Sequence, residues 1–437
     1  MRTLRHDVLG RFIKAKHSKA ATESPVRFVK SKRSVASQCP ACGLSSKKIL
    51  LVVEDQDRKL EVVKCRCGTI FYPGAVAPDY EVVENRASFF MRIDQAEGID
   101  SSLMPLFSSP SLNRMPVLDI GCGLGFTSDF IRFQGRGCLA FDPSSAAKLS
   151  TEFLKIEILS EYASMQNTLM GEPALAFASE VIEHVDNPLS FLRDIHEILG
   201  NQGFLIATTP NASFVKKENP TNTLLAMLAP SQHLFLLSEK SLLNLAKNAG
   251  FTWAKTWVVE ERLFLIAGPE EVSLQNCFPR DQYILYLERQ IQNLEIDGVI
   301  RHRAFGYRLF KEYVHSSRYE LANNLYGELS KSYLTLGFDL SNPLEIVNKY
   351  TAAAGLVKTL PNPEFFPYNM ALVLYLQGTL LLAYRHDRLA AKPYFDAAIL
   401  LSDLYRKVFT QGIFQAYDLE IQSVSQWAEE SIRIHCL

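Results

Sequence analysis

The run VLDIGCGLG at positions 117–125 constrains the fold of this chain more than any other feature. Its first residues are apolar apart from one acid, as expected of a short buried strand. Its glycines, Gly121, Gly123 and Gly125, leave the backbone free to turn tightly and to approach a ligand closely. Residues 126–133 then carry apolar side chains at helical spacing. A strand, a glycine-rich turn and a helix in this order predict a cofactor-binding element.

The next predicted strand supports this interpretation, because it ends at an acid. Residues 138–141 form an apolar run followed by Asp142, whose carboxylate can accept hydrogen bonds from both hydroxyls of a ribose. A Gly-x-Gly-x-Gly run also occurs in ordinary turns, so the context decides its meaning. A nicotinamide enzyme would more often carry Gly-x-Gly-x-x-Gly, but Phe126 stands three residues after Gly123.

Five segments in a fixed order resemble the class I S-adenosylmethionine-dependent methyltransferases. They are VLDIGCGLG at 117–125, AFDPS at 140–144, SEVIEHV at 179–185, GFLIATTPN at 203–211 and QHLFLLSEKSLLNLAKNAGF at 232–251. The resemblance implies an α/β fold with a Rossmann-like sheet of seven strands, ending in an antiparallel pair over 253–259 and 262–267. It also implies a cofactor site for S-adenosylmethionine formed by Asp119, Gly121, Gly123, Gly125, Asp142, Ser179 and Glu180.

Two histidines are the candidate catalytic residues. His184 ends the Glu-x-x-Glu-His run formed with Glu180 and Glu183, which matches ubiquinone-type O-methyltransferases and implies a divalent cation near the acceptor. The same residues can instead orient the loop, or His184 can act as the general base, since imidazole titrates near neutral pH. His233 lies in residues 211–237, here called the acceptor segment, where this fold usually places acceptor contacts. It is either a catalytic group or a residue that fixes the loop.

Four cysteines near the N-terminus predict a zinc ribbon over residues 39–73. Cys39 and Cys42 form one pair and Cys65 and Cys67 the other, with strand-like runs between the pairs. Thiolates on two turns can converge on one tetrahedral site, although Cys-x-Cys is one residue shorter than the usual spacing. Structural zinc is our prediction, and unliganded cysteines are the alternative. Similar ribbons precede some sugar-modifying and natural-product methyltransferases, which favours a related substrate.

The remaining chain divides by pattern. Residues 74–114 predict a connecting or lid segment and 115–270 the methyltransferase domain. Residues 271–437 predict an all-α domain, which is either similar to a tetratricopeptide repeat or an ordinary bundle. Residues 1–38 carry ten Lys or Arg against two acids, which predicts a disordered basic tail. Contact with a polyanion or a membrane surface, or a transit peptide, are the alternatives.

Composition places the chain among globular proteins. It has 437 residues, 47% hydrophobic and 21% charged, with a net charge of −1. The sequence shows neither a secretory segment nor an uninterrupted apolar run of the roughly 18 residues that a spanning helix needs. Eight cysteines in so long a chain suggest reduced thiols or a metal site, and so a cytoplasmic location.

These features predict an S-adenosylmethionine-dependent methyltransferase acting on a hydroxyl of a sugar, glycan precursor or small metabolite. The competing hypothesis is a catalytically weak scaffold that uses its ribbon and helical domain to bind partners. Retention of the glycine loop and of the acids around it argues against the scaffold. The helical domain is a candidate surface for a protein partner, whereas a nucleic acid partner is not expected. The sequence leaves the acceptor, the methylated atom and the oligomeric state open.

Overall fold

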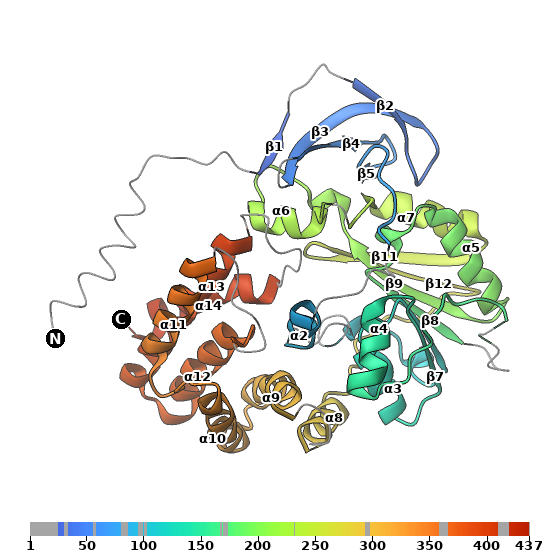
Figure 1. The fold of residues 1–437 in the computed structure, drawn as a ribbon. Coiled ribbons are helices and arrows are strands. Elements are labelled where there is room, and N and C mark those ends of the chain that lie inside the picture. The colour runs from blue at the N-terminus through green and yellow to red at the C-terminus, as the bar shows by residue number, and fades with distance from the viewer. Residues whose placement is uncertain are drawn as a thin grey trace.

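The computed structural model describes residues 25–29, 34–55, 58–79, 86–94, 99, 103–166, 168, 174–230, 232–292, 298–357, 366–409 and 419–436. It contains a central mixed sheet, a smaller N-terminal sheet and a group of C-terminal helices (Figure 1). Within these ranges, no helix combines the length and apolarity needed to cross a membrane.

The central sheet has the strand order β11-β12-β9-β8-β6-β7. Its strands are β6 (Val117–Ile120), β7 (Cys138–Phe141), β8 (Leu175–Ser179), β9 (Phe204–Pro210), β11 (Trp253–Val259) and β12 (Arg262–Gly268). Strands β6 to β9 pair in parallel, and β12 runs antiparallel to both β9 and β11. The chain order reverses between β6 and β8, and ligands of such sheets bind beyond the carboxyl ends of the strands at this point.

The described sheet has six strands where the sequence predicts seven. At the seventh position, beside β7, Leu159 forms a single parallel bridge with Phe141. The Leu159 N–H donates to the carbonyl of Ala140, and the Asp142 N–H donates to the carbonyl of Leu159. The chain then bends at residues 160–161, so the pairing does not extend into a ladder.

Helices cover both faces of the central sheet. They are α3 (Phe126–Phe133), α4 (Ser145–Leu149) and α8 (Arg280–Gln292) on one face, and α5 (Pro188–Leu199) and α7 (Glu239–Ala249) on the other (Figure 1). Alternation along β6 explains this, because Val117 packs on the first face and Leu118 on the second. The side chains of Asn187 and Ser238 cap α5 and α7.

The N-terminal sheet contains β1 (Val26–Phe28), β2 (Ser34–Gln38), β3 (Ser45–Asp55), β4 (Arg58–Lys64), β5 (Ile70–Phe71) and β10 (Phe235–Leu236). Strands β1 and β2 lie within the predicted disordered tail, 1–38, which is therefore too long at its carboxyl end. Both strands pair with β3, and Val26 is buried against the sheet. Residues 1–24 lie outside the described residues.

The C-terminal helices are α9 (Gly298–His315), α10 (Tyr319–Thr335), α11 (Pro343–Val357), α12 (Met370–Arg385), α13 (Arg388–Phe409) and α14 (Leu419–Ser431), with a π-helical turn η8 (Ile432–Cys436). In Figure 1 they lie opposite the central sheet, with α2 (Arg86–Asp94) between the two. A fully buried ion pair, 3.1 Å between Arg303 and Asp94, ties α9 to α2. The short connection between α12 and α13 gives a helical hairpin, while its likeness to a tetratricopeptide repeat stays a prediction.

Two short helical turns lie in the predicted connecting segment, 74–114. They are η3 (Met104–Phe107) and η4 (Pro110–Leu112). Leu106, Phe107 and Leu112 are buried in the same core as α3 and α8. This part of the segment therefore packs as an integral layer of the central domain.

Candidate active site

The glycine loop after β6 has the backbone that only glycine adopts easily. Gly121, Gly123 and Gly125 have φ values of +72°, +56° and +76°. A Cβ at Gly125 would lie 2.8 Å from the side chain of Ile156, and one at Gly121 would lie 2.6 Å from Val181. The loop is therefore fixed both by its dihedral angles and by close packing around it.

Asp142 holds this loop from the end of β7. Its two carboxylate oxygens accept the N–H groups of Gly123 and Ser144, each at 2.8 Å. The residue is 8% exposed. A carboxylate has further lone pairs, so the same oxygens can accept the hydroxyls of a ribose placed over the loop.

Asp119 is a buried residue of β6, two positions before the glycine loop. The hydroxyl of Ser128, on α3, donates to its carboxylate at 2.6 Å. Burial, together with the charge of Asp142, raises the pKa of Asp119 to about 7 against the opposing hydrogen bond from Ser128. Asp119 therefore joins β6 to α3, the helix that follows the glycine loop.

The end of β8 holds Ser179 and Glu180 against β9. The Ser179 hydroxyl is 2.9 Å from that of Thr208, which also donates to the Glu180 carboxylate at 2.8 Å. Glu180 has φ +56°, a strained conformation for this residue type. This turn directs Glu180 toward Thr208, while Glu183 belongs to a separate cluster.

Glu183, His184 and His233 converge at the end of β8. The first two lie on the 3-10 turn η6 (Ile182–His184), and His233 comes just before β10. The Oε1 atom of Glu183 lies 4.0 Å from Nε2 of His184 and 3.9 Å from Nε2 of His233. The two imidazole rings meet edge to face, 4.7 Å apart. The structure thus brings both predicted catalytic histidines together.

Both histidines direct Nε2 toward Glu183 and Nδ1 toward a backbone carbonyl. Nδ1 of His184 lies 3.1 Å from the carbonyl of Gln232, and Nδ1 of His233 contacts the carbonyl of Met227 at 2.6 Å. Because a carbonyl only accepts, these bonds place a hydrogen on Nδ1 of each ring and leave Nε2 facing Glu183. The two Nε2 atoms are therefore placed to accept a proton or to bind a cation.

Burial sets the protonation of this cluster. Glu183 is fully buried, and its other oxygen accepts the Thr209 hydroxyl at 3.0 Å while Oε1 has no hydrogen-bond partner. Burial raises the pKa of Glu183 well above its usual range, and the charge of Glu180 adds to this. Burial also lowers the pKa of His233 to about 4, against the opposing bond to Met227. His233 is therefore neutral at physiological pH.

The sequence predicts His184 and His233 as catalytic residues but not Glu183, which lies near both. Its position in the Glu-x-x-Glu-His run was visible in the sequence, but its approach to His233, across fifty residues, was not. The hydrogen bond from the Leu234 N–H to the Glu183 carbonyl, at 2.8 Å, closes that distance.

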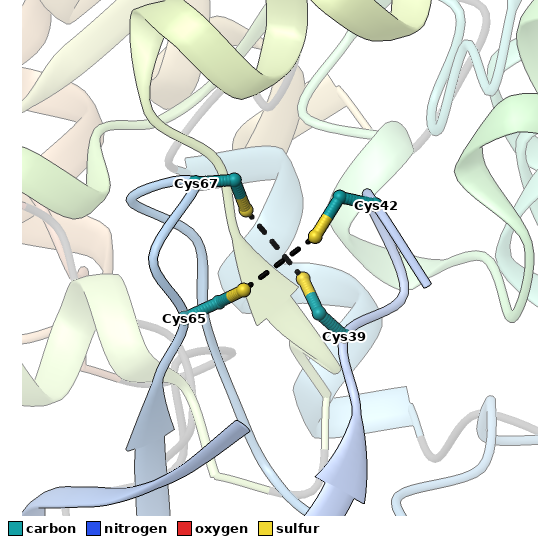
Figure 2. A group of neighbouring side chains, drawn as sticks. All are labelled: Cys39, Cys42, Cys65 and Cys67. Carbon is teal, nitrogen blue, oxygen red and sulfur yellow. Dashed lines mark hydrogen bonds between the residues drawn. The ribbon is translucent and has the colours of Figure 1, made fainter. Parts of the chain in front are cut away.

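The four predicted metal-binding cysteines form one cluster (Figure 2). The Sγ atoms of Cys39 and Cys67 are 3.6 Å apart and those of Cys42 and Cys65 are 3.5 Å apart. Four thiolates at ~2.3 Å from a tetrahedral zinc ion would lie about 3.8 Å from one another. The hydrogen bond from Cys39 lowers the pKa of Cys67 to about 4, and the same bond raises that of Cys39. The shortened Cys65-x-Cys67 turn does not prevent convergence.

Comparison with known proteins identifies the class. Residues 91–256 match the family model described as a methyltransferase domain. The mitochondrial ubiquinone biosynthesis O-methyltransferase of Rattus norvegicus is 26% identical over 175 residues, 38% of this chain and 46% of the relative. The enzyme of the same name from Ruegeria pomeroyi is 31% identical over 120 residues, 26% of this chain and 45% of the relative.

Solved structures that are similar to this chain include human N-acetylserotonin methyltransferase in complex with S-adenosylmethionine, at 14% identity and a TM-score of 0.34. That likeness covers 43% of this chain and 56% of the other. The chain thus spans less than half the length of the two sequence relatives. Residues 91–256 thus match a methyltransferase domain, and the two sequence relatives support the predicted class, the class I S-adenosylmethionine-dependent methyltransferases.

Proposed function

We propose that this chain transfers a methyl group from S-adenosylmethionine to a hydroxyl of a sugar, glycan precursor or small metabolite. The observation that carries the proposal is the pairing of two sites at adjacent strand ends. The glycine loop and Asp142 follow β6 and β7, and the Glu183, His184 and His233 cluster follows β8. One site fits the methyl donor, and the other offers bases or ligands for an acceptor.

The residues after β6 and β7 fit S-adenosylmethionine. The glycine loop keeps the tight turn that this class of fold presents to its ligand, since Cβ atoms at Gly121 and Gly125 would strike Val181 and Ile156. Asp142 lies at the strand end where a ribose is held in this class of fold. S-adenosylmethionine supplies an electrophilic methyl group on a sulfonium, so the protein acts mainly by orienting the reactants and excluding water.

A hydroxyl acceptor must lose its proton, and the histidine cluster can take it. His233 is neutral with its Nε2 lone pair toward the cluster, and so can accept a proton from a hydroxyl placed there. His184 presents Nε2 to the same cluster. The carboxyl of Glu183 lies 3.9 Å from Nε2 of His233, and in its ionised form it can stabilise the imidazolium that forms.

A divalent cation at this cluster is the second way to activate a hydroxyl. The oxygen of Glu183 and the Nε2 atoms of His184 and His233 lie within 4.8 Å of one another. Histidines that bind metals commonly donate their other ring N–H to a carbonyl, as both do here. This set replaces the predicted one of Glu180, Glu183 and His184, because Glu180 is held by Thr208 instead.

Zinc in the four-cysteine cluster is part of the proposal. The two Sγ separations support a tetrahedral site, and four thiolates leave no open coordination position. Its role is therefore structural. We propose a cytoplasmic location on the same ground, since such thiols stay reduced there. Metal analysis of freshly purified protein should find one zinc per chain, and finding none would remove this part.

Labelled S-adenosylmethionine tests the reaction. Purified protein is incubated with methyl-labelled donor and fractionated cell extract, and the labelled product is identified by mass spectrometry. A methylated hydroxyl is expected. Label only on nitrogen or carbon would overturn the acceptor assignment, and no labelled product in any fraction would count against turnover.

Histidine variants then test the cluster. His184→Ala and His233→Ala should keep donor binding, and at least one should lower turnover by about 10²–10⁴-fold. His196→Ala is the matched control, because His196 packs on Phe251 at 4.9 Å between helices outside the site. If a divalent ion is bound, a chelator that spares the ribbon zinc should also lower turnover. Parent rates in both variants from pH 6 to 9 would contradict the role of the cluster.

A further inference from the structure

The ribbon is built into the acceptor side of the site rather than attached to the domain as a separate module. Strand β5, which follows Cys65 and Cys67, pairs antiparallel with β10, so that Phe71 faces Phe235 and Ile70 faces Leu236. Strand β10 begins two residues after His233. The N-terminal sheet therefore ends in a strand that belongs to the acceptor segment.

Hydrophobic packing couples the same two parts. One face of the N-terminal sheet forms a shared core with the acceptor segment. This core contains Val26 from β1, Leu51, Val53, Val62, Ile70 and Tyr72 from the ribbon, and Ala212, Val215, Leu224, Leu225, Met227, Leu228 and Leu236 from the segment. Helix α6 (Thr221–Leu228) thus packs against the ribbon through the buried side chains of its last two turns.

The second cysteine turn also contacts the helix that follows the segment. Ser238, the N-cap of α7, donates its hydroxyl to the carbonyl of Cys67 at 2.9 Å. Gly68 has φ +98°, and a Cβ there would lie 2.5 Å from the Ser238 hydroxyl. Only glycine fits this contact, so the position of the cysteine turn and the start of α7 depend on each other.

A short chain of backbone hydrogen bonds links the ribbon to the histidine cluster. The Tyr72 N–H donates to the Leu234 carbonyl at 3.0 Å, and the Leu234 N–H donates to the Glu183 carbonyl at 2.8 Å. Leu234 is the residue after His233. Leu234 therefore connects the chain that leaves the cysteine turn to both catalytic-cluster residues, to Glu183 by a hydrogen bond and to His233 by a peptide bond.

We infer that the metal-binding turn Cys65–Gly68 positions the acceptor side of the active site, so that loss of the ribbon metal disorders the acceptor segment while the donor site persists. This inference rests on the zinc proposed for the ribbon. The donor site lies after β6 and β7, and its loop is fixed by Asp142, Val181 and Ile156, none of which belongs to the ribbon. Gly68 and Ser238 are positioning residues, since they act through the segment that carries His233.

Hydrogen exchange on the full-length protein tests the inference without knowledge of the acceptor. Zinc is withdrawn from the parent protein with a mercurial reagent, and its release is followed by a metal-sensitive dye. Exchange at Leu224–Leu228 and Phe235–Leu236 should rise at least tenfold, while exchange at Val117–Ile120 and affinity for S-adenosylhomocysteine stay within about twofold. Unchanged exchange in the acceptor segment after zinc release, or an equal rise in both regions, would overturn the inference.

A pair of glycine variants separates this role from general stability. Gly68→Ala forces the cysteine turn away from Ser238, whereas Gly43→Ala changes the equivalent glycine of the other turn, with φ +71° and nothing within 4 Å of its Cβ. Gly68→Ala should raise exchange in the acceptor segment and lower turnover without changing donor affinity. Gly43→Ala should do neither. Equal effects of the two variants would refute a specific role for the Cys65–Gly68 turn.

If the purified protein holds no metal, the zinc proposal fails, and this inference fails with it. If it holds zinc but does not bind S-adenosylhomocysteine, the proposed methyl transfer fails instead. If the protein holds zinc and binds S-adenosylhomocysteine, but hydrogen exchange in the acceptor segment does not change when zinc is released, only this inference is contradicted. The three outcomes are distinguished by metal content, calorimetry and hydrogen exchange on the same sample.

Discussion

Substituting Gly125 by alanine should damage the donor site by an amount that the structure allows us to estimate. Gly125 has φ +76°, and the left-handed region costs a residue with a Cβ about 1–2 kcal/mol. The new Cβ would also lie 2.8 Å from Ile156 and 2.9 Å from Ile158. Overpacking of this kind costs a further ~1–3 kcal/mol. We therefore expect Gly125→Ala to lower the free energy of unfolding by about 2–5 kcal/mol.

Gly135→Ala is the matched control for this variant. Gly135 has φ +75°, but nothing lies within 4 Å of its Cβ position. It should therefore lose only the backbone term, about 1–2 kcal/mol. Urea unfolding gives both values, and calorimetry with S-adenosylhomocysteine should show weaker binding for Gly125→Ala alone. Equal losses of stability, or parent affinity in Gly125→Ala, would refute the packing argument.

Two further predictions concern pH and helix packing. Burial raises the pKa of Asp119 to about 7, so the stability from its folded-state proton is complete below about pH 4 and lost as the pH rises to 7. Between pH 5 and 7 this should cost about 2–3 kcal/mol in urea unfolding of the parent, and Asp119→Asn should flatten that slope; an unchanged slope would contradict it. Gly378→Ala places a Cβ 2.8 Å from Phe395 and should lower the melting temperature, with a cost of about 1–3 kcal/mol. In Gly327→Ala, inside α10, the new Cβ meets nothing within 4 Å, so this variant should raise the melting temperature, with a gain of about 0.4–1 kcal/mol in the free energy of unfolding. Shifts of the same sign in the two variants would show that packing around the new Cβ does not determine their stability.

Local signals in the sequence located many elements of the central domain. The cap at Asn187 and the glycine at 200 bound α5, and Ser238 and Gly250 bound α7, because capping groups act within one helical turn. The glycine loop was predictable for the same reason. Its conformation depends on residues that adjoin it in the sequence.

Features set by distant contacts were not predictable in this way. The fully buried Asp94 and Arg303 pair joins side chains 209 residues apart, and nothing near either residue specifies the other. Glu180 and Glu183 lie in one motif, yet the positive φ of Glu180 and its bond to Thr208 separate them. Strands β1 and β2 lie in a basic segment with weak strand character, and they form by pairing with β3. In each case, a contact between residues distant in the sequence determines the local structure.

Calorimetry with the purified full-length chain tests the central claim most directly. We expect S-adenosylmethionine and S-adenosylhomocysteine to bind and NADH not to bind, and we expect Gly123→Leu to abolish binding by filling the loop held by Asp142. Strong binding of NADH with none of S-adenosylmethionine would contradict it.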